Sequence, residues 1–166
     1  MVEEETRHSP GFSHLDAEGS ARMVDVGNKQ DTNREAVATG SIVMSRQCFD
    51  LLTENNVPKG DVFGAARIAG IMASKKVDEL IPLTHSLPIS GSDISFKFDQ
   101  ERSAVEITAS VKVTGKTGVE MEALTAVSIA ALTVYDMCKS LDKKMIIENI
   151  RLLHKSGGKS GTFTRD

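Results

Sequence analysis

The longest apolar segment of the chain lies between Thr114 and Lys139 and carries charges only near its ends. A loop of Gly, Lys and Thr opens it, and apolar residues then fall on every face of a helix with about 3.6 residues per turn. This pattern predicts a buried helix, because a surface helix keeps one polar face. Many interior residues are small, which predicts close packing against another helix or a sheet.

Shorter patterns predict the elements around this helix. Alternating or short apolar runs predict four strands, at 37–45, 94–98, 105–113 and 144–153. Helical patterns occupy 48–56 and 62–80, and Asp61 is the predicted N-cap of the second. The order β-α-α-β-β-α-β predicts an α+β fold of the ferredoxin-like, or split β-α-β, type. In this sandwich, helices pack on one face of an antiparallel sheet.

The rest of the chain is interpreted as one domain with two tails. Residues 1–21 are polar and acidic, and we expect them to be disordered. Residues 22–160 are expected to form a single catalytic domain, followed by a flexible tail at 161–166.

Two irregular segments of the domain carry candidate residues. The polar segment 23–36 is expected to wrap over the domain, and its charges, Arg34 among them, are interpreted first as surface charges. Two prolines interrupt 81–89, which predicts an extended connection. His85 within it is more typical of a satisfied structural residue than of a ligand. Lys59, in a Pro-Lys-Gly turn, is interpreted locally as solvated.

Composition limits the classes of protein to consider. The 166 residues, 40% of them hydrophobic, suffice for one core. A net charge of −3 gives no overall attraction to nucleic acid or anionic membranes. The acidic N-terminus does not resemble a signal peptide, and the long apolar segment is too short to span a bilayer. Cys48 and Cys138 lack zinc spacing and are interpreted as reduced thiols of a soluble cytoplasmic protein.

Two Gly–Lys sequences resemble phosphate-binding loops. A Walker A motif needs a further Gly where TGKTG has Ser110 before it, and where the later GGKSG has Leu153. A P-loop nucleotidase is therefore not predicted. Flexible Gly–Lys loops still offer backbone N–H groups and ammonium charges to phosphates.

Charged residues at the two ends of the long helix are candidates for chemistry. Thr117 and Glu120 fit a capping box, which would explain Glu120 structurally, whereas Glu122 has no such explanation. Asp136 and Lys139 are neighbours on the helix, expected to be partly desolvated, and are equally open to a structural or a functional interpretation. Glu122 and Asp136 share a face but lie about 21 Å apart along the axis. If both are functional, the second comes from another subunit.

Several phrases of the chain resemble one known family. MVDV, KGDVF, ARIAGIMA, IPLTH, TGKTGVEMEALTA, LTVYDMCK and KSGGKSG occur here in this order. They resemble the MoaC family of molybdenum-cofactor biosynthesis, the cyclic pyranopterin monophosphate synthases. The similarity runs from about Phe12 to Phe163, nearly the whole chain.

The resemblance implies a fold, an assembly and a reaction. It implies a ferredoxin-like subunit in a homohexamer, a trimer of dimers, with active sites at subunit interfaces. The implied reaction converts 3′,8-cyclo-7,8-dihydro-GTP, made by a radical-SAM GTP cyclase partner, into cyclic pyranopterin monophosphate and pyrophosphate. It implies no metal and no organic cofactor.

The matching motifs imply roles for individual residues. The implied catalytic residues are Asp136, Lys139 and Lys59. The implied substrate-binding residues are Leu83, Thr84, His85, Met121 and Glu122, with Arg34, Lys155 and Lys159 expected on the phosphates.

One departure and one rival interpretation accompany the resemblance. Thr84 and Ser86 stand where the family usually has Cys and Pro. The rival is a ferredoxin-like regulatory module that binds a nucleotide or pterin without turnover. Such a module would leave the Asp136–Lys139 pair without a role. An RNA-binding domain fits less well, because the strands lack the aromatic residues that stack on bases.

Overall fold

The computed structural model describes residues 19–54 and 57–166. Nearly all of the segment expected to be disordered, 1–21, therefore lies outside the described residues. The elements are β1 Thr32–Val43, α1 Arg46–Thr53, α2 Val62–Ser74, α3 Val77–Leu80, β2 Ile89–Asp99, β3 Ala104–Gly115, α4 Glu120–Cys138, β4 Ile146–Ser156 and β5 Phe163–Thr164.

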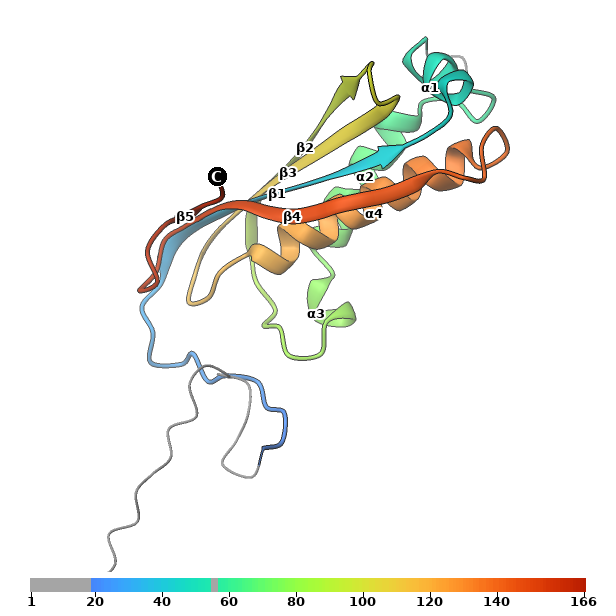
Figure 1. Ribbon diagram of the computed structural model, residues 1–166. Coiled ribbons are helices and arrows are strands. Elements are labelled where there is room, and N and C mark those ends of the chain that lie inside the picture. The colour runs from blue at the N-terminus through green and yellow to red at the C-terminus, as the bar shows by residue number, and fades with distance from the viewer. Residues whose placement is uncertain (1–18, 55–56) are drawn as a thin grey trace, which may run out of the picture.

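The five strands form one sheet in the order β2-β3-β1-β4-β5, with all neighbours antiparallel. Strand β3 lies between β1 and β2, which are joined in sequence by helices α1 to α3. Strand β1 in turn lies between β3 and β4, which are joined by α4. These are two split β-α-β units, so the predicted α+β, ferredoxin-like fold is confirmed. Figure 1 shows α2 and α4 on one face of the sheet.

The core lies between the sheet and these two helices. Burial alternates along β3: Ile107, Ala109 and Val111 are fully buried, whereas Thr108 and Ser110 between them are more exposed. Gly70 of α2 sits so close to α4 that an added Cβ would lie 2.8 Å from the carbonyl oxygen of Ala126. The small residues of α4 therefore permit the close helix packing that the sequence predicts.

Helix α4 is less buried than its sequence predicts. Its inner face contributes fully buried residues to the core, but Leu132 is 53% exposed. The prediction of burial on every face is thus wrong for a single chain. Along the opposite face runs a half-buried or exposed row that we call the outer stripe: Met121, Thr125, Ile129, Leu132 and Asp136. Length and composition alone would let α4 cross a membrane, but it packs here as a core helix does, against α2 and three strands.

Some predicted boundaries differ from the structure. Asp61 is confirmed as the N-cap of α2, accepting from the Gly64 backbone N–H at 2.8 Å. The predicted helix 62–80 instead ends at Ser74 and resumes as the single turn α3. Its break coincides with a hydrogen bond between the hydroxyls of Ser74 and Ser92 of β2.

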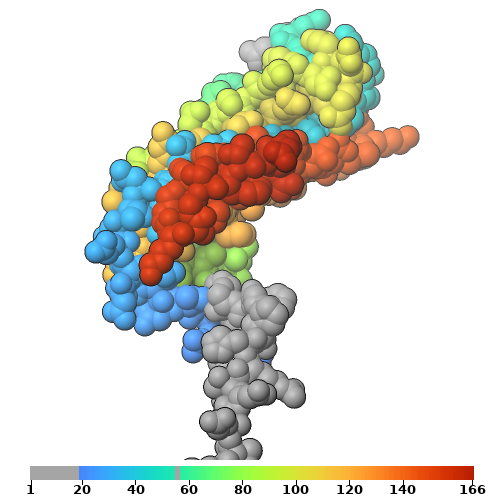
Figure 2. Space-filling model, turned by 60° about the vertical axis from the view of Figure 1, so that its left-hand side comes forward, coloured from blue at the N-terminus to red at the C-terminus, as the bar shows by residue number. Residues whose placement is uncertain are grey.

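The two ends of the domain are paired in the sheet. Strand β1 begins at residue 32, five residues before the prediction, because its polar start pairs with the end of β3. Residues 163–164, expected in a flexible tail, form β5 beside Lys155 and His154 of β4. Figure 2 shows the N-terminal described residues (blue) and the C-terminal strands (red) next to each other on one surface.

Candidate active site

The C-terminal end of α4 gathers the three residues expected to be catalytic. The Lys59 ammonium donates to the backbone carbonyl of Asp136 at 2.8 Å and lies 3.5 Å from its carboxylate. Lys139 donates to the same carboxylate at 2.6 Å. We call these three residues, after the role expected for them, the catalytic cluster. The turn 57–60 and the last turn of α4 position them although they are far apart in sequence.

The catalytic cluster is open to solvent in the single chain. The side chains of Asp136 and Lys139 are 60% and 52% exposed, so the expectation of partial desolvation is wrong here. The hydrogen bond and charge of Lys139, with the charge of Lys59, lower the pKa of Asp136. The hydrogen bond that Lys139 donates to Asp136, together with the negative charge of Asp136, raises the pKa of Lys139. The pairing therefore favours the charged forms of both side chains.

A second group of predicted residues lines a cavity of about 380 Å³ at the N-terminal end of α4. We call this cavity the helix-end pocket. It brings together all five residues expected to contact the substrate through the loop before β2 and the start of α4: Leu83, Thr84, His85, Met121 and Glu122.

Glu122 is the buried acid of the helix-end pocket. It is only 3% exposed, and burial raises the pKa of its carboxyl from 4.5 to about 7, with Glu120 and Asp78 adding to the rise. A carboxyl that is half-protonated near neutral pH either gives or takes a proton. Glu122 is therefore suited to acid–base work or to hydrogen bonding with either type of partner.

His85 and Thr84 have partners within the chain. Nε2 of His85 lies 2.8 Å from the carbonyl oxygen of Val24, which only accepts, so Nε2 carries the proton. His85 thereby holds the N-terminal segment beside the pocket. The hydroxyl of Thr84, at the usual family Cys position, donates to the carbonyl of Ile81 at 2.9 Å. It stabilises the turn rather than offering a free group.

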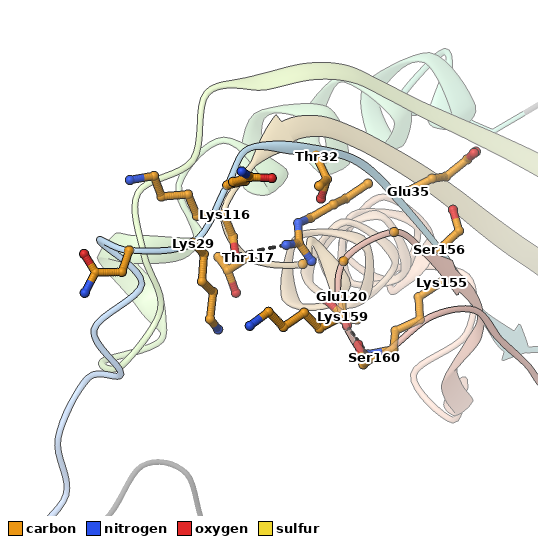
Figure 3. Close-up of a pocket in the computed structure, with 16 residues that line it drawn as sticks. Lys29, Thr32, Glu35, Lys116, Thr117, Glu120, Lys155, Ser156, Lys159 and Ser160 are labelled. Atoms are coloured by element: carbon orange, nitrogen blue, oxygen red, sulfur yellow. Dashed lines mark hydrogen bonds and ion pairs between the residues drawn. The ribbon is translucent and has the colours of Figure 1, made fainter.

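A larger cavity of about 730 Å³, which we call the lysine pocket, adjoins the helix-end pocket. It holds Arg34, Lys155 and Lys159, the residues expected on the phosphates, and two further lysines, Lys29 and Lys116. Figure 3 shows Lys29 and Lys159 extending into the same space from different segments. The two pockets share Lys29, Thr117, Gly118 and Glu120 in their walls, so they adjoin each other, and we call the two together the cleft.

Glu120 has a role different from the predicted one. The N-cap of α4 is Val119, without a side-chain hydrogen bond, so the predicted capping box is wrong. Glu120 instead forms an ion pair with Lys155 at 2.9 Å across the lysine pocket (Figure 3). The TGKTG motif indicated from the sequence that Lys116 and Thr117 could line a phosphate site. Lys29 lies in a segment without a distinctive pattern, so the sequence did not indicate it.

The sites at the two ends of α4 do not meet within one chain. Asp136 follows Glu122 by fourteen positions, which is about 21 Å of helix. The structure therefore brings the predicted residues together in two places: the cleft at one end of α4 and the catalytic cluster at the other.

Comparison with known proteins supplies the family. A sequence profile described as "MoaC family" matches residues 23–158, most of the chain. The chain belongs to the MoaC family. Three relatives of this MoaC protein, each named cyclic pyranopterin monophosphate synthase, are similar to it over nearly its whole length. The one from Pelotomaculum thermopropionicum is 59% identical, over 93% of this chain and 91% of the relative.

The other two relatives are similarly close. The Heliobacterium modesticaldum protein is 56% identical, over 93% of this chain and 98% of its own length. The Chloroflexus aggregans protein is 58% identical, over 93% and 94%. The family resemblance stated from the sequence is thus confirmed across nearly the whole MoaC chain.

Proposed function

We propose that this MoaC protein is a cyclic pyranopterin monophosphate synthase that rearranges a GTP-derived substrate, 3′,8-cyclo-7,8-dihydro-GTP, and releases pyrophosphate. The observation that carries the proposal is the pair of adjoining pockets that make up the cleft at the start of α4. Its helix-end pocket offers Glu122 and His85 to a polar ring system, and its lysine pocket offers cationic side chains to a polyphosphate. A derivative of a nucleoside triphosphate carries a polar ring system and a polyphosphate in the same molecule.

Charge supports the placement of the phosphates. Five basic side chains line the lysine pocket, against two acidic ones, although the whole chain has a net charge of −3: Lys29, Arg34, Lys116, Lys155, Lys159, Glu35 and Glu120. A cleft lined mainly by one sign of charge concentrates ligands of the opposite sign. An anionic ligand would also take over the ammonium of Lys155 that Glu120 now pairs.

We place the complete active site between two copies of the chain. The catalytic cluster lies about 21 Å of helix from Glu122, too far for one small substrate. The outer stripe of α4 links these two ends and stays exposed at Leu132, as do Ile68 and Met72 on α2. A two-fold axis across the middle of this face would pack two α4 helices antiparallel. Each catalytic cluster would then lie against the partner's cleft, and the exposed apolar side chains would be buried.

The chemistry assigned to each residue follows from its environment. Lys139, held as an ammonium by Asp136, would deliver a proton when the purine ring opens. Lys59, fixed on the Asp136 carbonyl, would stabilise negative charge at the departing pyrophosphate. Glu122 would exchange a proton with the ring nitrogens, because its carboxyl titrates near neutrality.

The wider assignments rest on the family. We propose the homohexamer, built as a trimer of dimers, the radical-SAM GTP cyclase as the supplier of substrate, and a cytoplasmic location. The two-fold contact described above accounts only for the dimer within such a hexamer.

The first test is single-turnover conversion of 3′,8-cyclo-7,8-dihydro-GTP, read as the fluorescent pterin formed after oxidation. Wild type would run beside Lys59→Ala, Lys139→Ala and Asp136→Asn, each checked for folding. Product from wild type alone, with pyrophosphate released in step, supports both the reaction and the catalytic cluster. Tight binding without product from wild type would refute the enzyme and favour the regulatory module.

The second test asks whether the site is shared. Lys139→Ala disables the catalytic cluster, and Glu122→Gln disables the cleft that the other copy would contribute to the same site. Each variant alone should therefore be inactive. After subunit exchange, mixed dimers regain one intact site, and random mixing restores about a quarter of all sites. As a control, mixing Lys139→Ala with Asp136→Asn restores nothing, because both changes affect the same half. No recovery despite exchange proven by mass spectrometry would refute the shared site.

A further inference from the structure

The guanidinium of Arg34 makes two hydrogen bonds to the protein backbone. Its Nε donates to the carbonyl of Gly115 at 2.9 Å, and Nη2 donates to the carbonyl of Lys116 at 3.0 Å. Both acceptors belong to the backbone of the loop that opens α4. The planar guanidinium of Arg34, a residue of β1, thus holds the TGKTG loop by two adjacent backbone carbonyls.

The other side of the same guanidinium contacts the second Gly–Lys loop. Gly158 has φ of +75°, and a Cβ added there would collide with the guanidinium of Arg34, whose atoms are the three nearest. Gly157 has φ of +93°, and a Cβ there would collide with the carbonyl oxygen of Asn33 and lie 3.1 Å from Cγ of Arg34. The glycines therefore let this loop lie directly on Arg34.

We propose that Arg34 is a positioning residue that fixes the spacing of the two Gly–Lys loops, 115–118 and 157–160, and with it the width of the lysine pocket. The loops carry Lys116 and Lys159, which line the lysine pocket, whereas Arg34 acts through the loop backbones. This replaces the direct phosphate contact expected for Arg34 from the sequence. The identity of the ligand rests on the proposed function, but the bracing contacts do not.

Lysine cannot replace Arg34 in this role. A single ammonium keeps the charge but lacks the rigid fork that reaches two carbonyls at once. A direct phosphate ligand, by contrast, would keep much of its effect as lysine, since the charge is retained. Arg34→Lys therefore separates the two roles, and Lys159→Ala is the matched control that removes a pocket cation without touching the brace.

The experiment measures the ligand-free protein first. Hydrogen exchange of the 115–118 backbone should accelerate in Arg34→Lys and stay at the wild-type rate in Lys159→Ala. Tripolyphosphate binding, followed by calorimetry, should weaken about tenfold or more in Arg34→Lys, since two hydrogen bonds from a charged group are lost. Unchanged loop exchange with near-wild-type binding in Arg34→Lys would overturn the proposal. Unchanged exchange with weakened binding would overturn it equally, because the loss of binding would then not act through the loop.

A double-mutant cycle keeps the proposal testable if Arg34→Lys folds poorly. Gly158→Ala should weaken tripolyphosphate binding strongly in wild type, and less in an Arg34→Ala background, where the colliding group is gone. Strictly additive effects would overturn the proposal. Neither experiment needs turnover, so failure of the synthase reaction and failure of the brace are observed separately.

Discussion

Replacing Glu122 by Gln tests the buried acid at the base of the cleft. Glu122 is 3% exposed, and burial raises the pKa of its carboxyl from 4.5 to about 7. Gln has nearly the same shape and does not titrate. The variant therefore removes one proton-binding group and leaves the packing of α4 nearly unchanged.

The raised pKa fixes the sign and size of the effect on stability. Below pH 4.5 the carboxyl is protonated in both folded and unfolded chains, so the group contributes no pH dependence. Between 4.5 and about 7 the unfolded chain loses the proton first, and folding becomes less favourable as pH rises. At about 1.4 kcal/mol per pKa unit, the destabilisation of wild type levels off above pH 7 at about 3 kcal/mol.

The assay is urea unfolding of wild type and Glu122→Gln from pH 4.5 to 8.5, at equal protomer concentration because assembly adds to stability. Titrations shared by both proteins cancel in the difference. The Gln variant should gain stability relative to wild type up to pH 7, and then hold a constant advantage. Met121→Leu, a neutral change in the same pocket, should show a pH-independent difference. Parallel stability curves for wild type and Glu122→Gln would refute the buried, titrating acid.

Three further predictions follow from other contacts. Gly70→Ala should destabilise the protein by about 1–2 kcal/mol in urea unfolding, because overpacking against α4 exceeds the gain in helix propensity. Ellman's reagent should label Cys48 and Cys138 of the native protein only at the rate of unfolding, since both are buried and burial raises their pKa, that of Cys48 to about 12. Labelling within seconds at pH 8 would contradict this. Asp136→Asn should lower the pKa of Lys139, seen by NMR of its side chain, because the variant lacks the charge that raises it.

Local sequence patterns predicted much of the fold. The alternation of β3 and the small-residue face of α4 predicted the sheet and the helix packing, and Asp61 predicted the start of α2. The first part of β1 gave no such signal, because residues 32–35 are polar instead of alternating, and Thr32, Arg34 and Glu35 line the lysine pocket. The end of a strand that lines a site lacks the hydrophobic period by which strands are found.

The site was harder to predict where partners are distant in sequence. The local sequence around Glu120 fits a capping box, but its carboxylate instead forms an ion pair with Lys155 of β4. Arg34 was interpreted locally as a surface charge, and the family resemblance implied a phosphate contact. Only the tertiary structure puts two backbone carbonyls within its reach. Local sequence cannot show which of several available partners a charged side chain will meet.

Helix α4 connects the fold, the site and the proposed assembly. Its sequence calls for burial on every face, yet one chain leaves the outer stripe uncovered at Leu132. The same stripe ends at Asp136 on one side and at the helix-end pocket on the other, about 21 Å of helix apart. A second copy packed antiparallel on this stripe would cover the apolar side chains and bring the separated halves together in a single contact. The apolar excess of the helix and the incomplete site then have the same physical explanation.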